Sequence, residues 1–248
     1  MHIIITDIFK LKRLNSHILH YNIMDVGIKK SWKSMLIRYG AFDLVNQIYQ
    51  SEDKIYPLKK DVFNCFKYFR MKETKVVLLG QDPYIRENQA IGMAFAVPKT
   101  EKIPPSLKNI YKEMEESVNN FVSPNHGDIS RWNREEKILL LNTALTVING
   151  KSNSHKKQWE KITDRIIKKI SKKCESVIFI LLGNNAKKKI KFIDTDKHVI
   201  ISGVHPSPLS ANYCHKGTSR SFFGHNIFNN VNKMLLKNNK TQVNWNVN

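Results

Sequence analysis

The stretch VVLLGQDPY, residues 76–84, decides the fold because a run of apolar residues gives way abruptly to turn-forming and polar ones. Its first four residues carry no polar interruption, which is typical of a strand covered on both faces of a sheet. Asp82 then stands directly before Pro83, whose ring disfavours helical backbone at the preceding residue. The strand is therefore expected to end in an extended or turn segment that holds a carboxylate in place.

Three further apolar stretches have the same near-continuous character and are predicted to be buried strands: ILLL (138–141), VIFILL (177–182) and HVIIS (198–202). Helical patterns lie between them, one after Pro105 and one from Trp159. In the second helix, apolar residues share one face: Trp159, Ile162, Ile166, Ile167 and Ile170. Strands that alternate with helices predict an α/β fold, a three-layer sandwich with a central, largely parallel four-stranded sheet flanked by helices.

The chain of 248 residues shows no internal repeat and no Gly/Ser-rich linker, and its apolar segments continue from about Trp32 to Leu236. We expect one domain over residues 31–248, preceded by an N-terminal extension, residues 1–30, whose role is unassigned. The apolar runs fall far short of the roughly 20 residues that a membrane-spanning helix needs. The N-terminal residues do not resemble a secretory signal, so we expect a protein that is not secreted and has no membrane partner.

Cysteine usage argues against a disulfide framework and against a zinc site. The chain has only three cysteines, an odd number, and they are widely spaced at Cys65, Cys174 and Cys214. Small disulfide scaffolds and structural zinc sites use denser, paired spacings. We therefore expect reduced thiols and no structural metal.

The chain is strongly basic, with 41 Lys and Arg residues against 21 acids and a formal net charge of +20. Residues 151–191 hold thirteen basic residues and three acids, which is half of the excess in about one sixth of the chain. Such a field attracts polyanions, and nucleic acid is the first partner to consider. Asn, Lys and Ile are abundant throughout, however, as they are when the codons of an A/T-rich genome drift. Lysines that are merely solvated at the surface are therefore the alternative explanation of the same charge.

Polar or turn-forming residues follow each predicted strand: GQDPY, NTALTV, GNNAKKK and GVHPSPLS, in chain order. In open parallel sheets, ligands bind in the crevice beyond the carboxyl ends of the strands. Taken singly, these segments have ordinary structural explanations, because Asp-Pro forms turns, His-Pro closes loops and Asn caps helices. Taken together, they place an acid, an amide, a basic run and a histidine at one edge of the sheet, which indicates a site.

These segments resemble the motifs of the family 1 uracil-DNA glycosylases. GQDPY (80–84) and HPSPLSA (205–211) are similar to the two defining motifs of that family. Further similar segments occur in the same order: PPSLKNIYKEM (104–114), LLLNTALTV (139–147), SHKKQWEKITD (154–164), FILLGNNAKKK (179–189), FFGHNIF (222–228) and VNW (243–245). The resemblance covers about residues 32–245.

The resemblance implies cleavage of the N-glycosidic bond between uracil and deoxyribose in single- and double-stranded DNA, which leaves an abasic site and serves base-excision repair. It implies no metal and no organic cofactor, and a monomer. It also implies base flipping, because the target bond is inaccessible within the base stack. The protein would act in the nucleus or wherever the DNA lies, and in the host cell if it is viral.

Carried over onto this sequence, the resemblance assigns catalysis to two residues. Asp82 would align the attacking water and stabilise the positive charge that develops on the sugar. His205 would act as a neutral imidazole that donates a hydrogen bond to the O2 oxygen of the departing uracil. Preorganised charges and donors of this kind contribute most of the rate enhancement in many active sites.

Four further residues are assigned to the uracil ring by the same resemblance. Asn142 would read the edge of the base through its side-chain amide, and Phe95 would stack on the ring. Tyr84 would fill the space beside C5 and exclude the methyl group of thymine, a role that is compatible with an ordinary core tyrosine. Gln81 would line the pocket largely through its backbone.

The resemblance also assigns residues to DNA. Leu209 would enter the base stack as an apolar wedge, although without the family it is an ordinary packed leucine. Serines would contact phosphates, which positions DNA without reading its sequence, and prolines would stiffen their loop. The residues assigned in this way are Pro105, Ser106, Ser207, Leu209, Ser210 and Lys187, with Lys188 and Lys189 beside the last.

This sequence departs from the family pattern in several places. After GQDPY the family usually continues His-Gly-Pro-Gly-Gln-Ala-His-Gly, whereas this chain has IRENQAIG over residues 85–92. Asn88 replaces a glycine and is expected to tolerate left-handed backbone, while Ile91 replaces a histidine expected near the catalytic water. Leu182 and Asn184 replace the usual Trp and Ser.

An insertion lengthens the loop after the wedge residue Leu209: NYCHKGTS, residues 212–219. Its Cys214 and His215 are too few to form a tetrahedral metal site.

Two other functions compete with this one. The departures at residues 85–91 are compatible with a DNA-binding accessory protein that holds a polymerase on its template, as poxvirus relatives of this family do, and such a protein needs a replication-protein partner. The joint presence of Asp82, Asn142 and His205 favours the enzyme. An esterase-like hydrolase is disfavoured because the chain has no G-x-S-x-G nucleophile elbow.

Overall fold

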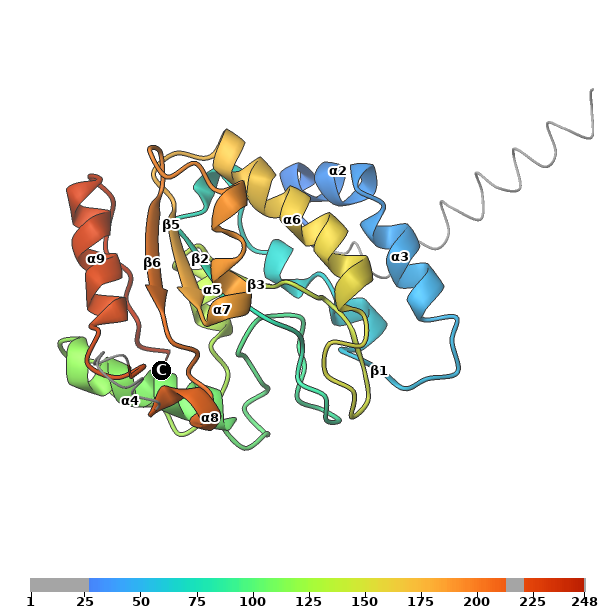
Figure 1. Ribbon diagram of the computed structural model, residues 1–248, viewed down its shortest axis with the longest axis horizontal. Coiled ribbons are helices and arrows are strands. Elements are labelled where there is room, and N and C mark those ends of the chain that lie inside the picture. The colour runs from blue at the N-terminus through green and yellow to red at the C-terminus, as the bar shows by residue number, and fades with distance from the viewer. Residues whose placement is uncertain (1–26, 213–220, 248) are drawn as a thin grey trace, which may run out of the picture.

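The computed structural model describes residues 27–212 and 221–247 (Figure 1). The predicted N-terminal extension, apart from residues 27–30, and the loop insertion, apart from Asn212, lie outside the described residues, and so do Cys214 and His215. Ile28 is buried in the core and the amide of Lys29 bonds the carbonyl oxygen of Phe66, so contact with the core begins before residue 31. The division at residues 30 and 31 stays a prediction.

A four-stranded parallel sheet in the order β3-β2-β5-β6 forms the centre of the molecule, as predicted. Each pairing between neighbouring strands is parallel and in register, with Val76 opposite Ile138 and Ile178. The strands coincide with the four predicted apolar stretches to within one residue at each end: β2 (Val76–Gly80), β3 (Ile138–Asn142), β5 (Ile178–Leu182) and β6 (Val199–Gly203). The predicted α/β sandwich is therefore confirmed.

One prediction about the sheet is wrong, because β6 is not fully buried. Its residues Val199, Ile200 and Ile201 are half-buried and Ser202 is exposed, whereas all residues of the other three strands are buried. β6 is an edge strand that pairs only with β5. β3 lies at the other edge of the sheet and is fully buried, so edge position alone does not account for the exposure of β6. An apolar run in the sequence predicts a strand, but it does not show how completely other elements cover that strand.

Helices cover both faces of the sheet, which completes the three layers (Figure 1). On one side lies α6, with the short helices α2 and α3 beside it, and on the other side lie α9 and α4. The bounds of these helices and of the shorter ones are α2 (Lys30–Arg38), α3 (Ala41–Ile48), α4 (Pro105–Ser117), α5 (Ser130–Arg134), α6 (Lys156–Lys173), α7 (Asn184–Lys187), α8 (Pro208–Ala211) and α9 (Ile227–Lys237). Single 3-10 turns occupy Lys59–Asp61, Asn64–Phe66, Met71–Glu73 and Ile190–Phe192.

The amphipathic helix predicted from Trp159 is α6, which begins three residues earlier. All five residues of its predicted apolar face are buried: Trp159, Ile162, Ile166, Ile167 and Ile170. Burying such a face contributes about 1.5 to 3 kcal/mol for each large apolar side chain. Among the described helices, none is long and apolar enough to cross a membrane.

A second, two-stranded sheet was not predicted. β1 (Ile55–Tyr56) pairs antiparallel with β4 (Val147–Ile148). Strands of two residues are too short to show any periodicity in the sequence. A hydrogen bond from the amide of Asn149 to the carbonyl oxygen of Lys54 extends this pairing, and one from the amide of Gly150 to the carbonyl oxygen of Ile85 ties the chain after β4 to the loop after β2. The small sheet thereby fixes the chain that follows β4.

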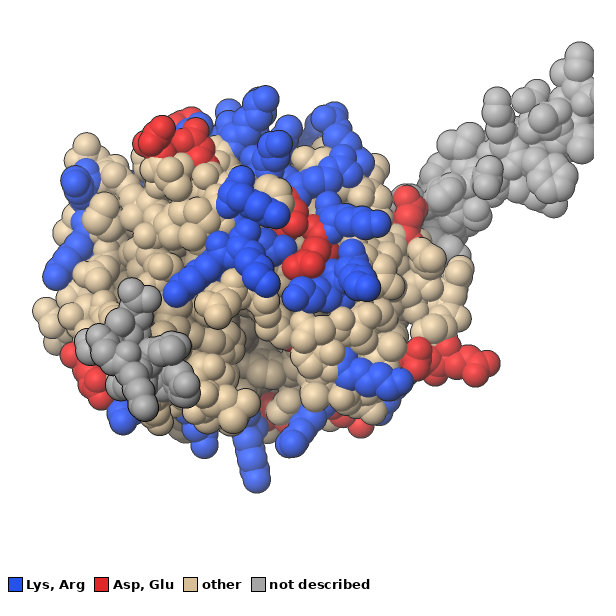
Figure 2. All heavy atoms as spheres, viewed as in Figure 1, with Lys and Arg blue, Asp and Glu red and all other residues tan. Residues whose placement is uncertain are grey.

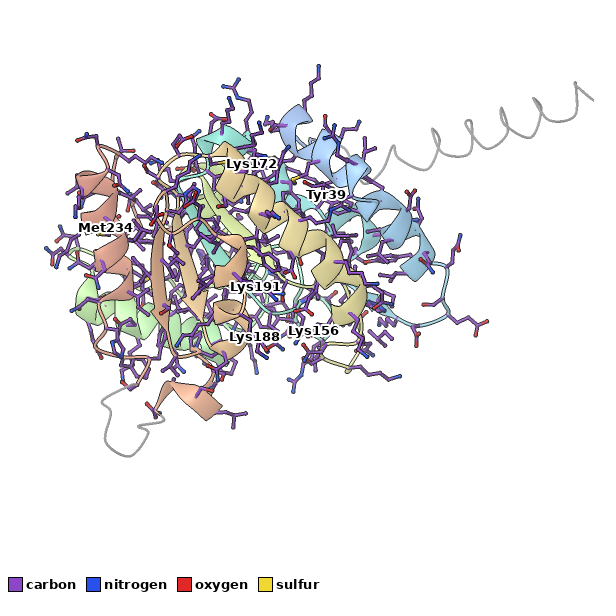
Figure 3. All side chains as sticks on the ribbon, turned by 45° about the horizontal axis from the view of Figure 1, so that its top comes forward. Tyr39, Lys156, Lys172, Lys188, Lys191 and Met234 are labelled. Atoms are coloured by element: carbon purple, nitrogen blue, oxygen red, sulfur yellow. The ribbon has the colours of Figure 1, made fainter. Side chains whose placement is uncertain are left out.

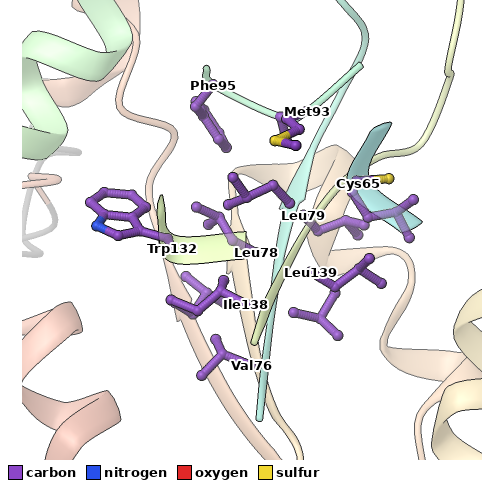
Figure 4. Close-up of a cluster of buried hydrophobic side chains, with 14 of the residues drawn as sticks. Cys65, Val76, Leu78, Leu79, Met93, Phe95, Trp132, Ile138 and Leu139 are labelled. Carbon is purple, nitrogen blue, oxygen red and sulfur yellow. The ribbon is translucent and has the colours of Figure 1, made fainter. Parts of the chain in front are cut away.

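The core lies between the sheet and its helices (Figure 4). Leu78 and Leu79 of the central strand, both buried, lie close to Ile138 and Leu139 of the neighbouring strand. Trp132 packs edge-on against Trp245 and donates its indole N–H to the carbonyl oxygen of that residue at 2.8 Å. The C-terminal segment is therefore tied into the same core as the central strands.

Truncating the centre of β2 tests this arrangement. Leu78→Ala should lower the free energy of unfolding by about 2 to 5 kcal/mol, because it removes buried methyl groups and leaves a cavity. Leu236→Ala is the matched control, since that side chain is 56% exposed, and it should change stability by less than about 0.5 kcal/mol. Urea denaturation measures both, and equal losses in the two variants would contradict the assigned core.

Candidate active site

The carboxyl ends of the strands enclose a cavity of about 270 Å³. It is smaller than the range of about 300 to 1,000 Å³ typical of pockets for drug-sized ligands, so it suits a single small ring. Of the residues predicted for the site, seven line this cavity: Gln81, Asp82, Tyr84, Phe95, Ser106, Asn142 and His205. They come from segments that are up to 124 residues apart in the sequence, and the parallel sheet brings them together.

Asp82 follows β2 in non-helical backbone, and its carboxylate is held from the loop after β4. Oδ2 accepts hydrogen bonds from the hydroxyl of Ser152 at 2.8 Å and from the backbone N–H of Asn153 at 2.7 Å. Oδ1 is 3.5 Å from the side-chain amide nitrogen of Gln81. Two donors on one oxygen fix the rotation of the carboxylate and leave the other oxygen lightly engaged. Such a group can hold a water or oppose a positive charge.

His205 is half-buried, and its hydrogen bonding identifies the protonated nitrogen. Nδ1 accepts the backbone N–H of Ser207 at 3.1 Å, so a neutral ring carries its proton on Nε2. Burial lowers the pKa of His205 below its usual value of 6.5, while the negative charge of Asp82 acts in the opposite direction. The net lowering favours a neutral imidazole at pH 7, with Nε2–H free to act as a donor.

Two glycines allow the backbone to approach the site side chains closely. A Cβ on Gly80 would lie 2.1 Å from the amide oxygen of Asn142, which stands opposite it in the sheet. A Cβ on Gly183 would lie 2.9 Å from that of His205, and Gly183 also has a left-handed φ of 84°. Any other residue at these positions would displace the amide or the imidazole, so the glycines set the shape of the cavity.

The aromatic wall of the cavity is held by a strained turn. Phe95 has a φ of 64°, a left-handed conformation that is uncommon for a bulky residue. The hydroxyl of Tyr84 donates a hydrogen bond to the carbonyl oxygen of Phe95 at 3.1 Å and so holds this turn. The ring of Phe95 is 6.3 Å from that of His205 between centroids, with an angle of 39° between the planes. Strain of this kind concentrates at functional sites.

A second hollow adjoins the first and shares Gly80, Gln81, Ser152 and His205 with it. Its volume is about 530 Å³, and its other lining residues include Leu182, Asn184, Ser207, Leu209 and Ser210. The side chain of Leu209 is 92% exposed, which is unusual for a leucine outside a binding surface. The side-chain amide of Asn109 in α4 donates a hydrogen bond to the carbonyl oxygen of Pro206 at 2.7 Å, so α4 and the segment that leads into α8 form one rim.

Not all residues assigned to DNA reach these hollows. Pro105 and Lys187 line neither of them. Lys189, which stands close to Lys187 in the sequence, is 5% exposed and lies 2.8 Å from Glu160 and 2.7 Å from Asp164 of α6. Its charge is therefore engaged by α6 and is not available to DNA at this loop.

The departures in the loop after Asp82 have distinct positions. Asn88 has a φ of 61°, so it adopts the left-handed backbone that was predicted for it. Ile85 lines the cavity, whereas Ile91, expected near the catalytic water, packs against the hydrophobic core and is not among the lining residues. The ion pair between Lys54 and Glu87, at 2.7 Å, connects this loop to the β1 segment.

Sequence reasoning missed several residues of the site. Ser152 and Asn153 hold Asp82, Met93 lines the cavity, and Asn185 donates to the side-chain oxygen of Gln81 at 2.8 Å. The polar turn KSNS before α6 was an available signal for the first two, since Ser and Asn favour turns and often bond nearby groups. Its link to an acid 70 residues earlier is not visible in the sequence.

Known proteins share the sequence of this chain over most of its length. The sequence pattern of the Uracil DNA glycosylase superfamily matches residues 66–226. The chain is 46% identical to the uracil-DNA glycosylase of Vibrio campbellii over 192 residues, which cover 77% of this chain and 81% of that protein. It is also 46% identical to the uracil-DNA glycosylase of Francisella tularensis over 194 residues, which cover 78% of this chain and 84% of that protein.

Solved structures give the same result at lower sequence identity. The crystal structure of mimivirus uracil-DNA glycosylase is 26% identical, with a TM-score of 0.79, and the match covers 90% of this chain and 89% of that one. A variant of the mimivirus UNG in complex with UGI has a TM-score of 0.81, and the match covers 91% of each chain.

The fold and site define an α/β protein with a small-ring cavity at the carboxyl edge of a parallel sheet, where a carboxylate and an imidazole meet. The matched sequence pattern and the relatives identify which group of such proteins this is. The chain belongs to the Uracil DNA glycosylase superfamily.

The state of His205 can be tested without any substrate. We predict a pKa below 6.5 for its ring, from burial, and a further decrease in Asp82→Asn, because that change removes the negative charge that favours the cation. Titration of the Cε1–H resonance by NMR measures both, with His205→Gln assigning the signal. Glu87→Gln, an exposed acid in the same loop, should leave the value unchanged, and a pKa above 6.5 in the wild type would contradict the assignment.

Proposed function

We propose that this chain hydrolyses the N-glycosidic bond between uracil and deoxyribose in DNA and leaves an abasic site. The observation that carries the proposal is that Asp82 and His205, 123 residues apart in the chain, line one small cavity together with Asn142 and Phe95. Membership of the superfamily supports the same function. The proposal requires no metal and no organic cofactor.

In the proposed reaction, the bond between N1 of uracil and C1′ of the sugar breaks and its electron pair leaves with the base. The sugar becomes positively charged, and Asp82 stabilises that charge and orients the water that attacks C1′. Ser152 and Asn153 hold Oδ2 of Asp82, so Oδ1 is the oxygen available to the water. A fixed carboxylate needs no reorganisation when the charge develops, which is the source of its catalytic effect.

His205 stabilises the opposite charge. The departing uracil becomes an anion whose charge lies partly on O2, and Nε2–H of the neutral imidazole donates a hydrogen bond there. The bond from Ser207 to Nδ1 supports the required tautomer, and the lowered pKa supports the neutral ring. Donation to an anion that forms only in the transition state accelerates the reaction without tightening substrate binding equally.

Recognition of uracil is assigned to the remaining lining residues. Asn142, at the end of β3, offers a donor and an acceptor that match O4 and N3 of uracil and mismatch cytosine. Phe95 stacks on the ring, and Tyr84 occupies the space beside C5 where thymine carries its methyl group. Gln81, whose side chain is engaged by Asn185, contributes its backbone.

The second hollow receives the DNA strand in this proposal. Leu209 enters the base stack from its exposed position, and the energy of its contacts offsets the few kcal/mol lost on unstacking a base. Serines at the rim contact phosphates: Ser106, Ser207 and Ser210. Pro105 stiffens the rim, and Lys187 contributes charge from outside the hollow. We further propose that the protein acts as a monomer in the compartment that holds the DNA, where a replication protein is a possible partner.

Removing the charge of Asp82 tests the proposal. Asp82→Asn should reduce uracil excision by at least about 100-fold, the loss typical for one preorganised group. The assay uses a single-stranded oligonucleotide with one uracil, a chelator, and detection of alkali-labile abasic sites. Glu87→Gln makes the same chemical change in an exposed acid of the same loop and should retain full activity. A wild-type protein that binds this DNA but leaves uracil intact would instead be the polymerase accessory protein.

Tyr84 provides a separate test of specificity. Tyr84→Ala should begin to excise thymine, because it vacates the space for the C5 methyl group, while Tyr84→Phe should still reject thymine since it keeps the ring. Excision from matched oligonucleotides with uracil or thymine measures this. If Tyr84→Ala rejects thymine as completely as the wild type does, another residue guards the pocket.

A further inference from the structure

The outer face of α6 carries a continuous line of cations that the catalytic site does not use. Lys157, Lys161, Arg165, Lys168 and Lys172, all exposed, follow one another at spacings of three or four residues. At about 100° per residue they fall within an arc of roughly 80°. The buried apolar face is on the opposite side of the helix. We call these five residues the α6 cation line.

The α6 cation line is only slightly neutralised. Among the described residues, none of its lysines forms an ion pair. The two acids of α6, Glu160 and Asp164, lie beside the line, and the buried Lys189 offsets one of their two charges. Arg165 is stacked over the ring of Tyr39 at 4.0 Å, which holds its guanidinium in place. Figure 2 shows that Lys and Arg atoms gather over the part of the surface where Figure 1 places α6.

The α6 cation line begins five residues after Ser152, which lines the catalytic cavity, and none of its own residues lines that cavity. α6 starts directly after the turn whose Ser152 and Asn153 hold Asp82, and its first turn is fixed because the indole N–H of Trp159 donates to Thr146 at 2.7 Å. From there the line runs about 22 Å, at 1.5 Å per residue, toward the opposite end of the sheet. In Figure 3 Lys156 and Lys172 mark the two ends of α6, and Lys188 and Lys191 lie beside it.

We propose that the α6 cation line binds the sugar–phosphate backbone of single-stranded DNA that flanks the uracil. This inference rests on the proposed function. A strand that leaves the cavity along α6 must turn from the carboxyl edge of the sheet onto the side of the molecule. Duplex DNA has a persistence length of about 150 base pairs and resists such a turn, whereas a single strand follows it. Positive surfaces that track a single strand typically engage about 4 to 16 nucleotides.

Two matched pairs of lysine substitutions test whether the α6 cation line binds single-stranded DNA. K168Q/K172Q removes two charges, four residues apart, from the line, and K233Q/K237Q removes two exposed charges at the same spacing from α9, on the other side of the sheet. Binding to a uracil-free single strand is measured by fluorescence anisotropy over a range of salt concentrations. The logarithmic salt slope should become shallower by about 1.4 in K168Q/K172Q, at roughly 0.7 per phosphate contact, and should not change in the control pair.

Excision then locates the contact on the substrate. Lengthening the single strand by about 12 nucleotides, within the site sizes typical of such surfaces, on one side of the uracil should lower KM for the wild type and the control pair. In K168Q/K172Q the added length should no longer lower KM, and kcat on the short substrate should stay unchanged. Equal salt slopes in the two pairs would overturn the proposal. So would a KM that still falls with the added length in K168Q/K172Q, or an α6 cation line that binds only an acidic protein. A protein that excises no uracil would refute the proposed function. The anisotropy measurement would still show whether the α6 cation line binds single-stranded DNA.

Discussion

The parallel, in-register pairing of four strands is the constraint on which the rest of the molecule depends. Because every strand in the sheet runs the same way, four chain exits meet at one edge, and each exit delivers one chemical group to the same place. The register sets Gly80 opposite Asn142, where a missing Cβ makes room for the amide. A slip of one residue along β3 would turn that amide to the other face of the sheet and close the cavity.

The two titratable groups at this edge of the sheet, Asp82 and His205, have different roles and lie in different surroundings. The carboxylate of Asp82 is held by polar donors in a partly exposed turn, whereas burial lowers the pKa of His205 and favours its neutral form. Two titratable groups whose environments differ in this way can oppose a positive and a negative charge in one reaction step. In this structure the hydroxyl of Ser152 and the backbone N–H of Asn153 hold the carboxylate of Asp82 from the loop after β4.

The sequence allowed much of the fold to be predicted, because continuous apolar runs and the periodicity of α6 are local signals. It did not show that β6 is only half-buried, since burial depends on which elements pack against a strand. The β1–β4 sheet and the contact from Ser152 to Asp82 escaped prediction for a similar reason: both join residues far apart in the chain without a local pattern. Asp82 and His205 were identifiable from their places after strands. The roles of Leu209 and Phe95 came only from resemblance, and net charge could not separate the buried Lys189 from the exposed lysines of α6.

The central claim is that a carboxylate and a neutral imidazole flank one extruded uracil. The most direct measurement is a crystal structure of Asp82→Asn bound to a single-stranded oligonucleotide that contains uracil. The base should lie in the cavity against Phe95, with Asn142 at its edge and Nε2 of His205 within about 2.7 to 3.2 Å of O2. A uracil bound outside the cavity, or one whose O2 faces away from His205, would contradict the claim.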